Sequence, residues 1–325
     1  MPRTRPPAVP LTGAFAPDTA RLADEAVSGL RAEAAELSPK FLYDALGSRL
    51  FEAITELPEY YLTRVEARIL SDRLPEIAAR FRADGLEFRT LIDLGAGNCA
   101  KAPALFDAFA PRRYVAVDIA TGFLADALER LRRAYPDIGM HGVGLDFSER
   151  LELPEGIADR PALVFYPGSS IGNFAPAQAR RLLREAREHA GCGGLLIGVD
   201  LLKPVAMLEA AYDDALGVTA AFNLNLLSNV NRLAGTDFDV RQWRHVARFD
   251  AAASRIEMHL EAREAVEVRL PDGPRRFRAG ERIHTENSYK WTTEAFEALL
   301  RDAGYRRVHA WTDPERLFGV FACSG

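Results

Sequence analysis

The stretch LIDLGAGNCAK, Leu91–Lys101, decides the fold of this chain of 325 residues. An apolar run, Thr90–Leu94, is followed by two closely spaced glycines, Gly95 and Gly97, and then by a helical pattern over Asn98–Ala110. Glycine lets the backbone turn sharply and leaves no side chain between the turn and a ligand. The unpaired N–H groups of a helix N-terminus face the same point. The stretch therefore predicts a strand, a glycine turn and a helix around a ligand site.

A second apolar run, Tyr114–Asp118, ends in an acid that is spaced to hydrogen-bond the two hydroxyls of a ribose. The third glycine of the dinucleotide fingerprint is absent, because Cys99 and Lys101 occupy its region. Without that glycine a helix packs less closely, and a pyrophosphate is less well received. The pattern favours S-adenosylmethionine, which has an adenosine but no phosphate, over NAD, and it indicates a methyltransferase-like nucleoside site.

The composition is that of an ordinary soluble globular protein, with 48% hydrophobic and 27% charged residues. A formal net charge of −5, with the arginines scattered among acids, argues against nucleic acid as a partner. No apolar run approaches the roughly 18 residues that cross a bilayer, so no membrane partner is expected. The proline-rich N-terminus, residues 2–10, lacks the apolar core of a signal peptide and is expected to be a loose tail.

Cysteine and histidine usage indicates a reducing cytoplasm and no metal. Cys99, Cys192 and Cys323 are far apart and odd in number, which excludes a disulfide framework and a CxxC metal pair. The histidines never fall at a ligand spacing such as HxxxH, so no structural metal is predicted. No heptad and no apolar stripe demands a dimer, and a cytoplasmic monomer is the expectation.

Alternating strand and helix patterns predict an α/β fold: a doubly wound, Rossmann-like methyltransferase sheet with a second, smaller α+β lobe that binds substrate. The sheet domain is expected over 63–202 and 289–325, and the second lobe over 1–62 and 203–288. Predicted strands are Thr90–Leu94, Tyr114–Asp118, Gly139–Leu145, Ala162–Tyr166, Gly194–Asp200, Arg306–Trp311 and Phe318–Cys323 for the main sheet, and Arg244–Asp250, Arg255–Ala262 and Ala265–Leu270, with Arg275–Phe277 added, for the lobe. Predicted helices are Asp18–Leu37, Arg64–Ala83, Asn98–Ala110, Phe123–Tyr135, one that begins at Pro176, the long stretch Val205–Ala234, and Thr293–Ala303.

Three further segments offer either chemistry or plain packing. Asp146 and Phe147 follow the third strand, where they suit the edge and face of an adenine, or else the acid caps a turn. Asn173, in the loop Pro167–Phe174, either caps the following helix or donates its amide to a substrate carboxylate. The aromatic segment Phe41–Tyr61 either packs a helical cap onto the sheet or forms a lid over the pocket.

These segments resemble the S-adenosylmethionine-dependent L-histidine Nα-methyltransferases of ergothioneine biosynthesis, which form the betaine hercynine. The similarity runs from Phe41 almost to the C-terminus, and several long, ordered motifs are far more specific than a glycine turn. The matching motifs are FLYD (Phe41–Asp44), LPEYY (Leu57–Tyr61), DLGAG (Asp93–Gly97), PGSSIGNF (Pro167–Phe174), AYDD with GVTAAFN (Ala211–Asp214 and Gly217–Asn223) and TENSYK (Thr285–Lys290).

The resemblance implies a role for each matching position. The residues implied to contact S-adenosylmethionine are Tyr43, Gly95, Lys101, Asp118, Asp146 and Phe147. Those implied for the substrate are Asn173 and Tyr212 at its carboxylate, Tyr60, Glu286 and Ser288 at its imidazole, and Gly168 and Ser170 near its amino group. The family often has Glu, Ser and Thr where this chain has Asp93, Asn98 and Ala102, which bears on cofactor affinity.

The implied reaction methylates the α-amino group of L-histidine, three times by family precedent, so the mono- and dimethylated forms are substrates too. The amine must lose a proton before each transfer, and water or Tyr43 is the candidate acceptor. A carboxylate such as Glu286 rewards an N–H donor and Ser288 can donate or accept, so an analogue without ring nitrogens leaves polar groups unpaired. Aromatic faces such as Tyr43 or Phe51 stabilise a quaternary ammonium product, unless Phe51 only packs the lid.

Three other functions share parts of this pattern. A nicotinamide dehydrogenase would also use Asp118, but the third glycine and a hydride-site histidine near the fourth strand are missing. A non-catalytic sensor of S-adenosylmethionine would not need a second set of polar residues for a small ligand. A different amino-acid N-methyltransferase would keep the fold and the cofactor site and would differ in the residues that read the imidazole, Glu286 and Ser288.

Overall fold

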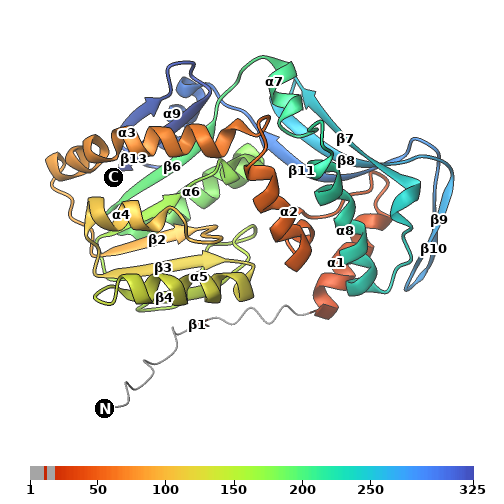
Figure 1. Cartoon of the computed structure of the whole chain (residues 1–325), viewed down its shortest axis with the longest axis horizontal. Coiled ribbons are helices and arrows are strands. Elements are labelled where there is room, and N and C mark those ends of the chain that lie inside the picture. The colour runs from red at the N-terminus through yellow and green to blue at the C-terminus, as the bar shows by residue number, and fades with distance from the viewer. Residues whose placement is uncertain (1–10, 13–18) are drawn as a thin grey trace, which may run out of the picture.

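The computed structural model describes residues 11–12 and 19–325, and the tail expected over residues 2–10 lies outside the described part. One eight-stranded sheet organises the larger half of the molecule (Figure 1). In spatial order its strands are β1 (Leu11–Thr12), β4 (Gly139–Gly144), β3 (Arg113–Asp118), β2 (Thr90–Leu94), β5 (Ala162–Tyr166), β6 (Gly194–Asp200), β13 (Phe318–Ser324) and β12 (Arg307–Thr312).

The strand order confirms the predicted Rossmann-like α/β fold. β13 pairs antiparallel with both of its neighbours, and the other pairings in the sheet are parallel. The order reverses direction between β2 and β5, as in a doubly wound sheet. Ligands of such sheets bind in the crevice beyond the carboxyl ends of the strands at this point. The glycine turn after β2 and the loop after β5 therefore border the same crevice.

Helices cover both faces of the sheet, because strand side chains alternate between them. In β5, Leu163 and Phe165 belong to one apolar cluster, and Val164 and Tyr166 belong to another. The first cluster includes residues of α3 (Tyr61–Ala83), α4 (Ala102–Phe109) and α5 (Thr121–Ala134), and the second includes residues of α6 (Pro176–Ala190) and α9 (Thr293–Asp302).

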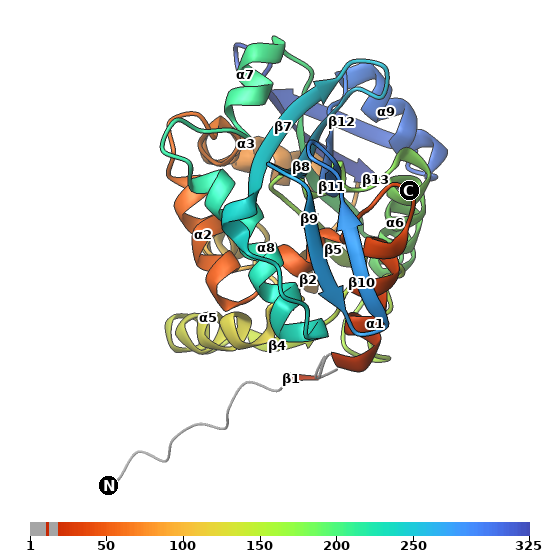
Figure 2. The ribbon, with the colours of Figure 1, turned by 90° about the vertical axis from the view of Figure 1, so that its right-hand side faces the viewer.

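The other described elements gather beside the sheet as a second lobe (Figures 1 and 2). Its helices are α1 (Thr19–Arg31), α2 (Ala45–Thr55), α7 (Val205–Ala210) and α8 (Val218–Ala234), with 3₁₀ turns η1 (Pro39–Leu42) and η3 (Val240–Gln242). Its strands are β11 (Arg282–Tyr289), β8 (Arg255–Ala262) and β7 (Trp243–Asp250), which form an antiparallel sheet in that order, and the hairpin of β9 (Val266–Leu270) and β10 (Gly273–Phe277).

One apolar cluster continues from the main sheet into the lobe. It contains Leu196 of β6 as well as Trp243 of β7 and Val268 of β9. The sheet and the second lobe thus share a core. The domain bounds expected from the sequence, 63–202 with 289–325 and 1–62 with 203–288, stay a prediction. Among residues 11–12 and 19–325, none of the helices has the length and hydropathy of a membrane span.

Two predicted elements of the lobe are wrong in detail, and one strand of the lobe is missing from the prediction. The helix expected to reach Leu37 ends at Arg31. The backbone around Glu36 instead pairs with β11, where the His284 N–H donates to the Ala35 carbonyl. The segment Arg275–Phe277 lies in a separate hairpin with β9 and does not extend the three-stranded sheet. β11 is a strand that the sequence pattern did not predict, since most of its residues are polar.

The long helix expected over Val205–Ala234 is also wrong, because it is broken between α7 and α8. Asp214 accepts hydrogen bonds from the N–H groups of Val218 and Thr219, at 2.9 and 2.7 Å, and so begins a new helix. The break leaves the AYDD motif in a turn, where its tyrosine can face the sheet.

Candidate active site

The glycine turn lies open at the carboxyl end of β2. Gly95 and Gly97 have φ angles of 67° and 54°, and a Cβ atom at either position would meet no heavy atom within 4 Å. Asp118, at the end of β3, accepts hydrogen bonds from the N–H groups of Gly97 and Ala120, both at 2.8 Å. The predicted ribose-binding acid therefore fixes the turn and borders the open space beside it.

Asp146 and Phe147 follow β4 at the same edge of the sheet. Asp146 accepts a hydrogen bond from the Ser148 N–H at 3.0 Å, which bears out the predicted turn cap. Its other oxygen lies 3.3 Å from the ammonium of Lys40 in η1, which also pairs with Glu25 of α1 at 2.6 Å. The pair predicted for an adenine thus lies where the second lobe meets the sheet.

Lys101 forms an ion pair with Glu66 of α3. The other carboxylate oxygen of Glu66 accepts a hydrogen bond from the Gly168 N–H at 2.8 Å. Glu66 is 1% exposed, and a buried carboxylate needs such partners. This glutamate therefore connects a predicted cofactor residue to the loop predicted near the substrate amine.

Asp93 is buried and hydrogen-bonded within the protein. The Tyr114 hydroxyl donates to one of its oxygens at 2.7 Å. Burial raises the pKa of Asp93 to about 7. The acid that departs from the family pattern is therefore a buried partner of Tyr114, beneath the glycine turn.

The loop after β5 has a strained backbone that a hydrogen bond holds in place. Gly168 and Ser169 both have left-handed φ angles, 76° and 60°, which are costly for a residue other than glycine. The Asp200 N–H donates to the Ser169 Oγ at 2.9 Å. The Ser170 hydroxyl is 3.4 Å from the Pro167 carbonyl oxygen, a weak contact that leaves it able to bind another group.

Asn173 does not cap the helix that follows it, so that alternative is wrong. The N-cap of α6 is Ala175, and the Asn173 side chain makes no hydrogen bond within the described residues. Beside it, Gly172 packs closely on β11: a Cβ atom there would lie 3.0 Å from the Tyr289 carbonyl oxygen and 3.3 Å from the Ser288 Oγ. The loop that carries this free amide therefore packs against β11 at a predicted imidazole-binding residue, Ser288.

A chain of aromatic rings runs from Tyr43 to Tyr212. Tyr43 meets Phe51 and Phe222 with ring centroids 5.7 and 5.5 Å apart. Phe51 meets Tyr60 at 6.2 Å, and Tyr60 meets Tyr212 at 6.3 Å. Phe51 thus packs between two predicted site tyrosines, and the rings form one wall of the candidate site.

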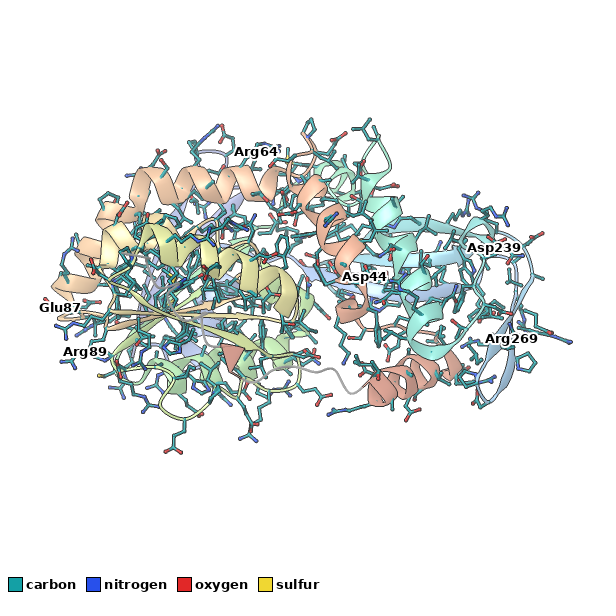
Figure 3. All side chains as sticks on the ribbon, turned by 60° about the horizontal axis from the view of Figure 1, so that its bottom comes forward. Asp44, Arg64, Glu87, Arg89, Asp239 and Arg269 are labelled. Carbon is teal, nitrogen blue, oxygen red and sulfur yellow. The ribbon has the colours of Figure 1, made fainter. Side chains whose placement is uncertain are left out.

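Polar contacts from α8 and α3 fix the backbone that carries these rings. The Asn225 amide donates to Asp44 at 2.7 Å, and the Asn229 amide donates to the Phe41 carbonyl at 2.8 Å. Arg64 donates to two carbonyl groups of the LPEYY motif, both at 2.6 Å. Figure 3 shows Asp44 between α2 and α8, and Arg64 on α3. Residues of α8 therefore hold the chain on both sides of Tyr43.

A β-bulge aims Glu286 and Ser288 at these tyrosines. In β11, His284 and Glu286 pair with consecutive residues of β8, so Thr285 is an extra residue. Residues i and i+2 of a regular strand share a face, and the extra residue therefore puts Glu286 and Ser288 on the face opposite to His284. The Thr285 hydroxyl donates to the Met258 carbonyl at 3.0 Å, which ties the bulge to β8.

Glu286 is a buried carboxylate without an internal hydrogen-bond partner. It is 7% exposed, and its Oε2 makes no hydrogen bond within residues 11–12 and 19–325. Burial raises the pKa of Glu286 to about 7, against the opposing effect of Lys290. Burial, the charge of Glu286 and, more weakly, that of Asp118 raise the pKa of Tyr43. Tyr43 therefore lies within electrostatic reach of both the predicted cofactor acid and the predicted substrate acid.

A buried ionic network lies behind the predicted substrate residues. Asp200, at the end of β6, pairs with Lys290 at 2.8 Å and also with Lys203. Lys290 donates to the Ser288 Oγ at 2.8 Å and to the Tyr212 hydroxyl at 3.0 Å. The side chains of Asp200 and Lys290 are both 0% exposed. The charges are thus fully desolvated, and their hydrogen bonds fix Ser288 and Tyr212 from behind.

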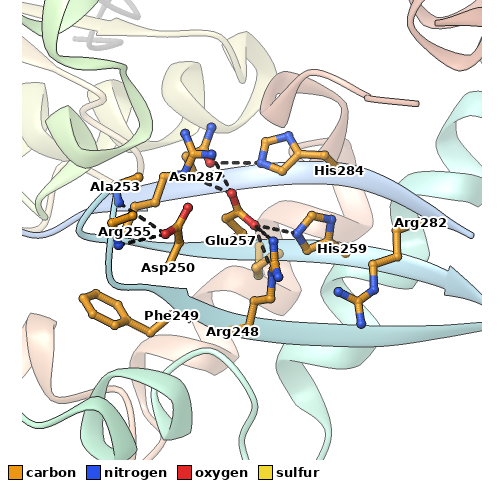
Figure 4. Close-up of polar contacts among 12 residues, drawn as sticks. Arg248, Phe249, Asp250, Ala253, Arg255, Glu257, His259, Arg282, His284 and Asn287 are labelled. Atoms are coloured by element: carbon orange, nitrogen blue, oxygen red, sulfur yellow. Dashed lines mark hydrogen bonds and ion pairs between the residues drawn. The ribbon is translucent and has the colours of Figure 1, made fainter. Parts of the chain in front are cut away.

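The opposite face of the three-stranded sheet is also polar, but its charged groups are paired with one another (Figure 4). Glu257 accepts hydrogen bonds from Arg248 at 2.7 Å, from Arg255 at 2.5 Å and from His259 at 3.1 Å. Two arginines and a histidine therefore satisfy this carboxylate without a ligand.

The structure brings the predicted residues together in two neighbouring sets. One set lies at the ends of β2, β3 and β4 and contains Gly95, Asp118, Asp146 and Phe147. The other set lies on the side of the second lobe and contains Tyr43, Tyr60, Tyr212, Glu286 and Ser288. The loop that carries Gly168, Ser170 and Asn173 contacts both sets. It reaches the first through Glu66, which also pairs with Lys101, and the second through its packing against β11. Within the described part of the chain, no group of three or more His, Cys, Asp or Glu side chains could hold a metal ion.

Sequence reasoning missed Glu66, Asp200, Lys203 and Lys290. The signal available for Asp200 is a charge at the end of a strand that is otherwise apolar, and the signal for Lys290 is its place at the end of the TENSYK motif. Glu66 gives no such signal, because α3 carries charges along most of its length.

Comparison with known proteins identifies close relatives. The family model described as histidine-specific methyltransferase, SAM-dependent, matches residues 22–325. A histidine N-alpha-methyltransferase of Mycolicibacterium smegmatis is 43% identical over 300 residues, which cover 90% of this chain and 91% of that protein. Another of Mycobacterium tuberculosis is 42% identical over 301 residues, with the same two coverages. Ergothioneine biosynthesis protein 1 of Neurospora crassa is 32% identical over 85% of this chain, a region that spans 32% of that longer protein.

Proposed function

The chain belongs to the family of histidine-specific, S-adenosylmethionine-dependent methyltransferases, and from that premise we propose the reaction in full. It transfers methyl groups from S-adenosylmethionine to the α-amino group of L-histidine. Three successive transfers give hercynine, the histidine betaine, for ergothioneine biosynthesis. The Neurospora relative, whose name refers to that pathway, supports this assignment.

The observation that carries the proposal is the unpartnered carboxylate of Glu286. A buried acceptor that lacks a partner costs free energy until a ligand donates to it. Glu286 shares a strand face with Ser288, two residues further along β11. An imidazole ring offers an N–H to Glu286 and its second nitrogen to Ser288, whereas an aliphatic or phenyl side chain has no ring nitrogen for either residue. Tyr60 packs against Tyr212 on the same wall, and we assign it to the imidazole ring as well.

The residues at the strand ends fit S-adenosylmethionine. The open glycine turn leaves room for a ligand at Gly95, and the acids that follow β3 and β4 suit a ribose and an adenine. We assign Asp118 to the ribose, Asp146 and Phe147 to the adenine, and Lys101 and Tyr43 to the remainder of the molecule. When bound, S-adenosylmethionine supplies a methyl group that is already strongly electrophilic, so the protein has only to position the amine.

Positioning is the task of the loop after β5 and of Tyr43. We assign the free amide of Asn173, with Tyr212, to the substrate carboxylate, and Gly168 and Ser170 to the surroundings of the amine. Holding two reactants in the attacking geometry can lower a barrier by about 7–11 kcal/mol in good cases. Because its pKa is raised, the Tyr43 phenol keeps its proton near neutral pH. It therefore acts as a hydrogen-bond partner that orients the amine, and water takes the proton away.

The aromatic wall suits the later substrates and the product. Each transfer adds bulk and removes an N–H, and the product is a quaternary ammonium that cannot be held by hydrogen bonds. Aromatic faces attract such cations. Tyr43, Phe51 and Tyr60 are packed edge to face, so each presents a ring to its neighbours and to the site.

We also propose that the protein acts on free small molecules as a cytoplasmic monomer. Its three cysteines are unpaired, and Cys99 and Cys323 are buried, which suits a reducing compartment. Light scattering of the purified protein should give the mass of one chain, 35.9 kDa, with and without the methyl donor; a mass of two chains would overturn the monomer.

The decisive experiment offers the purified protein S-adenosylmethionine and an equimolar mixture of the twenty amino acids, with mass spectrometry as the readout. We expect histidine to gain three methyl groups while the other amino acids stay unchanged. Methylation of a different amino acid would keep the fold and the cofactor site but overturn the roles of Glu286 and Ser288. Binding of S-adenosylmethionine without any methylation would support a sensor.

A further inference from the structure

Lys290 is a fully buried lysine whose three hydrogens are all used. Its Nζ lies 2.8 Å from Asp200 Oδ2, 2.8 Å from the Ser288 Oγ and 3.0 Å from the Tyr212 hydroxyl. An ammonium group has three donors and no acceptor. Ser288 and Tyr212 must therefore both accept a hydrogen bond from Lys290.

The hydroxyls of Ser288 and Tyr212 also bond to each other, at 2.7 Å. One of them donates to the other. The phenol, with an ordinary pKa of about 10, is a far stronger acid than an aliphatic alcohol, and its oxygen lone pair is partly delocalised into the ring. Tyr212 is consequently the better donor and Ser288 the better acceptor.

Ser288 Oγ is then filled as an acceptor, because Lys290 and Tyr212 occupy both of its lone pairs. Its own hydrogen is the one that remains free. Glu286 lies two residues earlier on the same strand face and has the opposite hydrogen-bonding capacity, because an ionised carboxylate only accepts hydrogen bonds. The two side chains therefore present one donor and one acceptor side by side.

We propose that Lys290 is a positioning residue that makes Ser288 a dedicated donor to a bare ring nitrogen, so that the site selects the neutral imidazole ring of histidine. The inference rests on the proposed function and deepens it. It also changes one assignment made above: a Tyr212 hydroxyl that donates its single hydrogen to Ser288 cannot donate to the substrate carboxylate, which is then left to Asn173. Without Lys290, Ser288 regains a lone pair and Asp200 competes for its hydrogen, so the reward for a bare ring nitrogen is lost.

Lys203 provides a matched control for Lys290. Both lysines pair with Asp200, and removal of either leaves Asp200 with one remaining ammonium. Lys203 contacts Tyr61 and Asp200 but makes no hydrogen bond with Ser288 or Tyr212 among the described residues. Lys203→Met therefore removes a buried lysine that pairs with Asp200, as Lys290→Met does, and keeps both acceptor sites of Ser288 occupied.

The experiment measures binding by calorimetry in the presence of S-adenosylhomocysteine at about pH 8, where free imidazole is neutral. The probes are L-histidine, the two pyrrolylalanine isomers, which keep one N–H and replace the other nitrogen by C–H, and thiazolylalanine, which keeps a bare nitrogen and lacks the N–H. The wild-type protein should prefer histidine over either pyrrolylalanine by about tenfold or more. Lys290→Met should bring this ratio close to one and leave the ratio of histidine to thiazolylalanine unchanged.

Lys203→Met should keep both ratios at their wild-type values. Ser288→Ala should lower the pyrrolylalanine ratio as Lys290→Met does, and adding Lys290→Met to Ser288→Ala should change it no further. The proposal is overturned if Lys290→Met leaves the ratio unchanged, if both lysine variants change it equally, or, should Lys290→Met not fold, if Ser288→Ala leaves it unchanged. Failure of the wild-type protein to bind histidine would instead overturn the proposed function.

Discussion

Glu257 and Glu286 lie on neighbouring strands of one sheet, but the pKa values of their carboxyl groups are shifted in opposite directions. They point to opposite faces, because Glu286 pairs with the residue that follows Glu257 in β8. Their exposed fractions are similar, 5% and 7%. Burial raises the pKa of Glu286 to about 7. Burial acts on Glu257 in the same direction, but hydrogen bonds from two arginines and His259 outweigh it and hold its pKa at about 2 (Figure 4).

The difference distinguishes a structural carboxylate, Glu257, from the carboxylate that we propose binds the substrate, Glu286. Burial alone does not distinguish them; the presence of internal partners does. Glu257 has its compensating charges in the folded protein, and removing one side of such a pair leaves the other side unpaired. Glu286 has no such partner within the described residues, and it stays costly until a ligand donates to it. Each of the following predictions treats the two faces of this sheet differently.

The largest expected effect is the loss of histidine turnover in Glu286→Gln. The amide keeps the shape of the side chain but removes the charge that accepts an imidazole N–H. We expect kcat/KM for histidine to fall about 100-fold or more, on the order of 3 kcal/mol. Steady-state kinetics measures it, and Glu257→Gln is the control, with kinetics like those of the wild type. Equal losses in both variants would remove the distinction between the two faces.

The same substitution should stabilise the unliganded protein. The folded-state pKa of about 7 is above the ordinary 4.5, so the contribution of Glu286 to stability is complete below pH 4.5 and is lost as the pH rises through 7. Glu286→Gln cannot ionise, and above pH 7 it should exceed the wild type by about 2–3 kcal/mol in free energy of unfolding. Denaturant unfolding at several pH values tests this. A variant that is less stable than the wild type at high pH would show that the carboxylate has a partner in the folded protein.

Glu257→Gln should change stability in the other direction. Its folded-state pKa of about 2 is below the ordinary 4.5, so its contribution is present above pH 4.5 and is lost as the pH falls through 2. Near neutral pH the variant should lose about 1–2 kcal/mol, a modest figure because Arg248 and Arg255 reach solvent. Unfolding curves should show the gap to the wild type closing in acid. A gap that is independent of pH would mean that shape, and not charge, matters at this position.

Tyr43→Phe examines the site face without touching a carboxylate. Tyr43 lies within reach of the charge of Glu286, and its hydroxyl is the proposed partner of the substrate amine. The ring and its packing on Phe51 and Phe222 are kept in the variant. We expect kcat to fall about tenfold while the histidine dissociation constant changes little. Rapid-quench kinetics with calorimetry separates the two, and an unchanged kcat would remove Tyr43 from the mechanism.

The cofactor half of the molecule could be predicted from the sequence because its signals are local. The bounds of β2, β5 and β6 match the predicted strands, since each is mostly apolar and buried on both faces. Even there the start of α4 is wrong, at Ala102 and not Asn98, because Cys99 takes a left-handed φ of 57°. A single non-glycine residue in that conformation leaves no mark on hydrophobic periodicity.

The substrate half could be predicted only as far as the family motifs reach. β11 has polar residues on both faces: one face carries the residues proposed to bind the imidazole, and the other carries paired polar groups. Alternation of apolar and polar residues therefore gives no strand signal. The bulge at Thr285 changes which residues share a face, and its position depends on pairing with β8. The contacts of Lys290 with Asp200 and Tyr212 join residues that are distant in sequence, and their function appears only in three dimensions.

The smallest expected effect compares two adjacent residues of β11 that face opposite ways. Asn287 belongs to the paired face, where its Oδ1 lies 3.0 Å from the His284 Nε2, and Ser288 belongs to the site face. Asn287→Ala removes one partly exposed hydrogen bond and should cost about 0.5–1 kcal/mol of stability, with no change in the KM for histidine. Ser288→Ala should raise that KM, and bound histidine should stabilise this variant less than it stabilises the wild type. Thermal unfolding and kinetics on both variants decide the matter: if Asn287→Ala raises the KM as much as Ser288→Ala does, the two faces are coupled, and the bulge does not isolate the binding face from its structural counterpart.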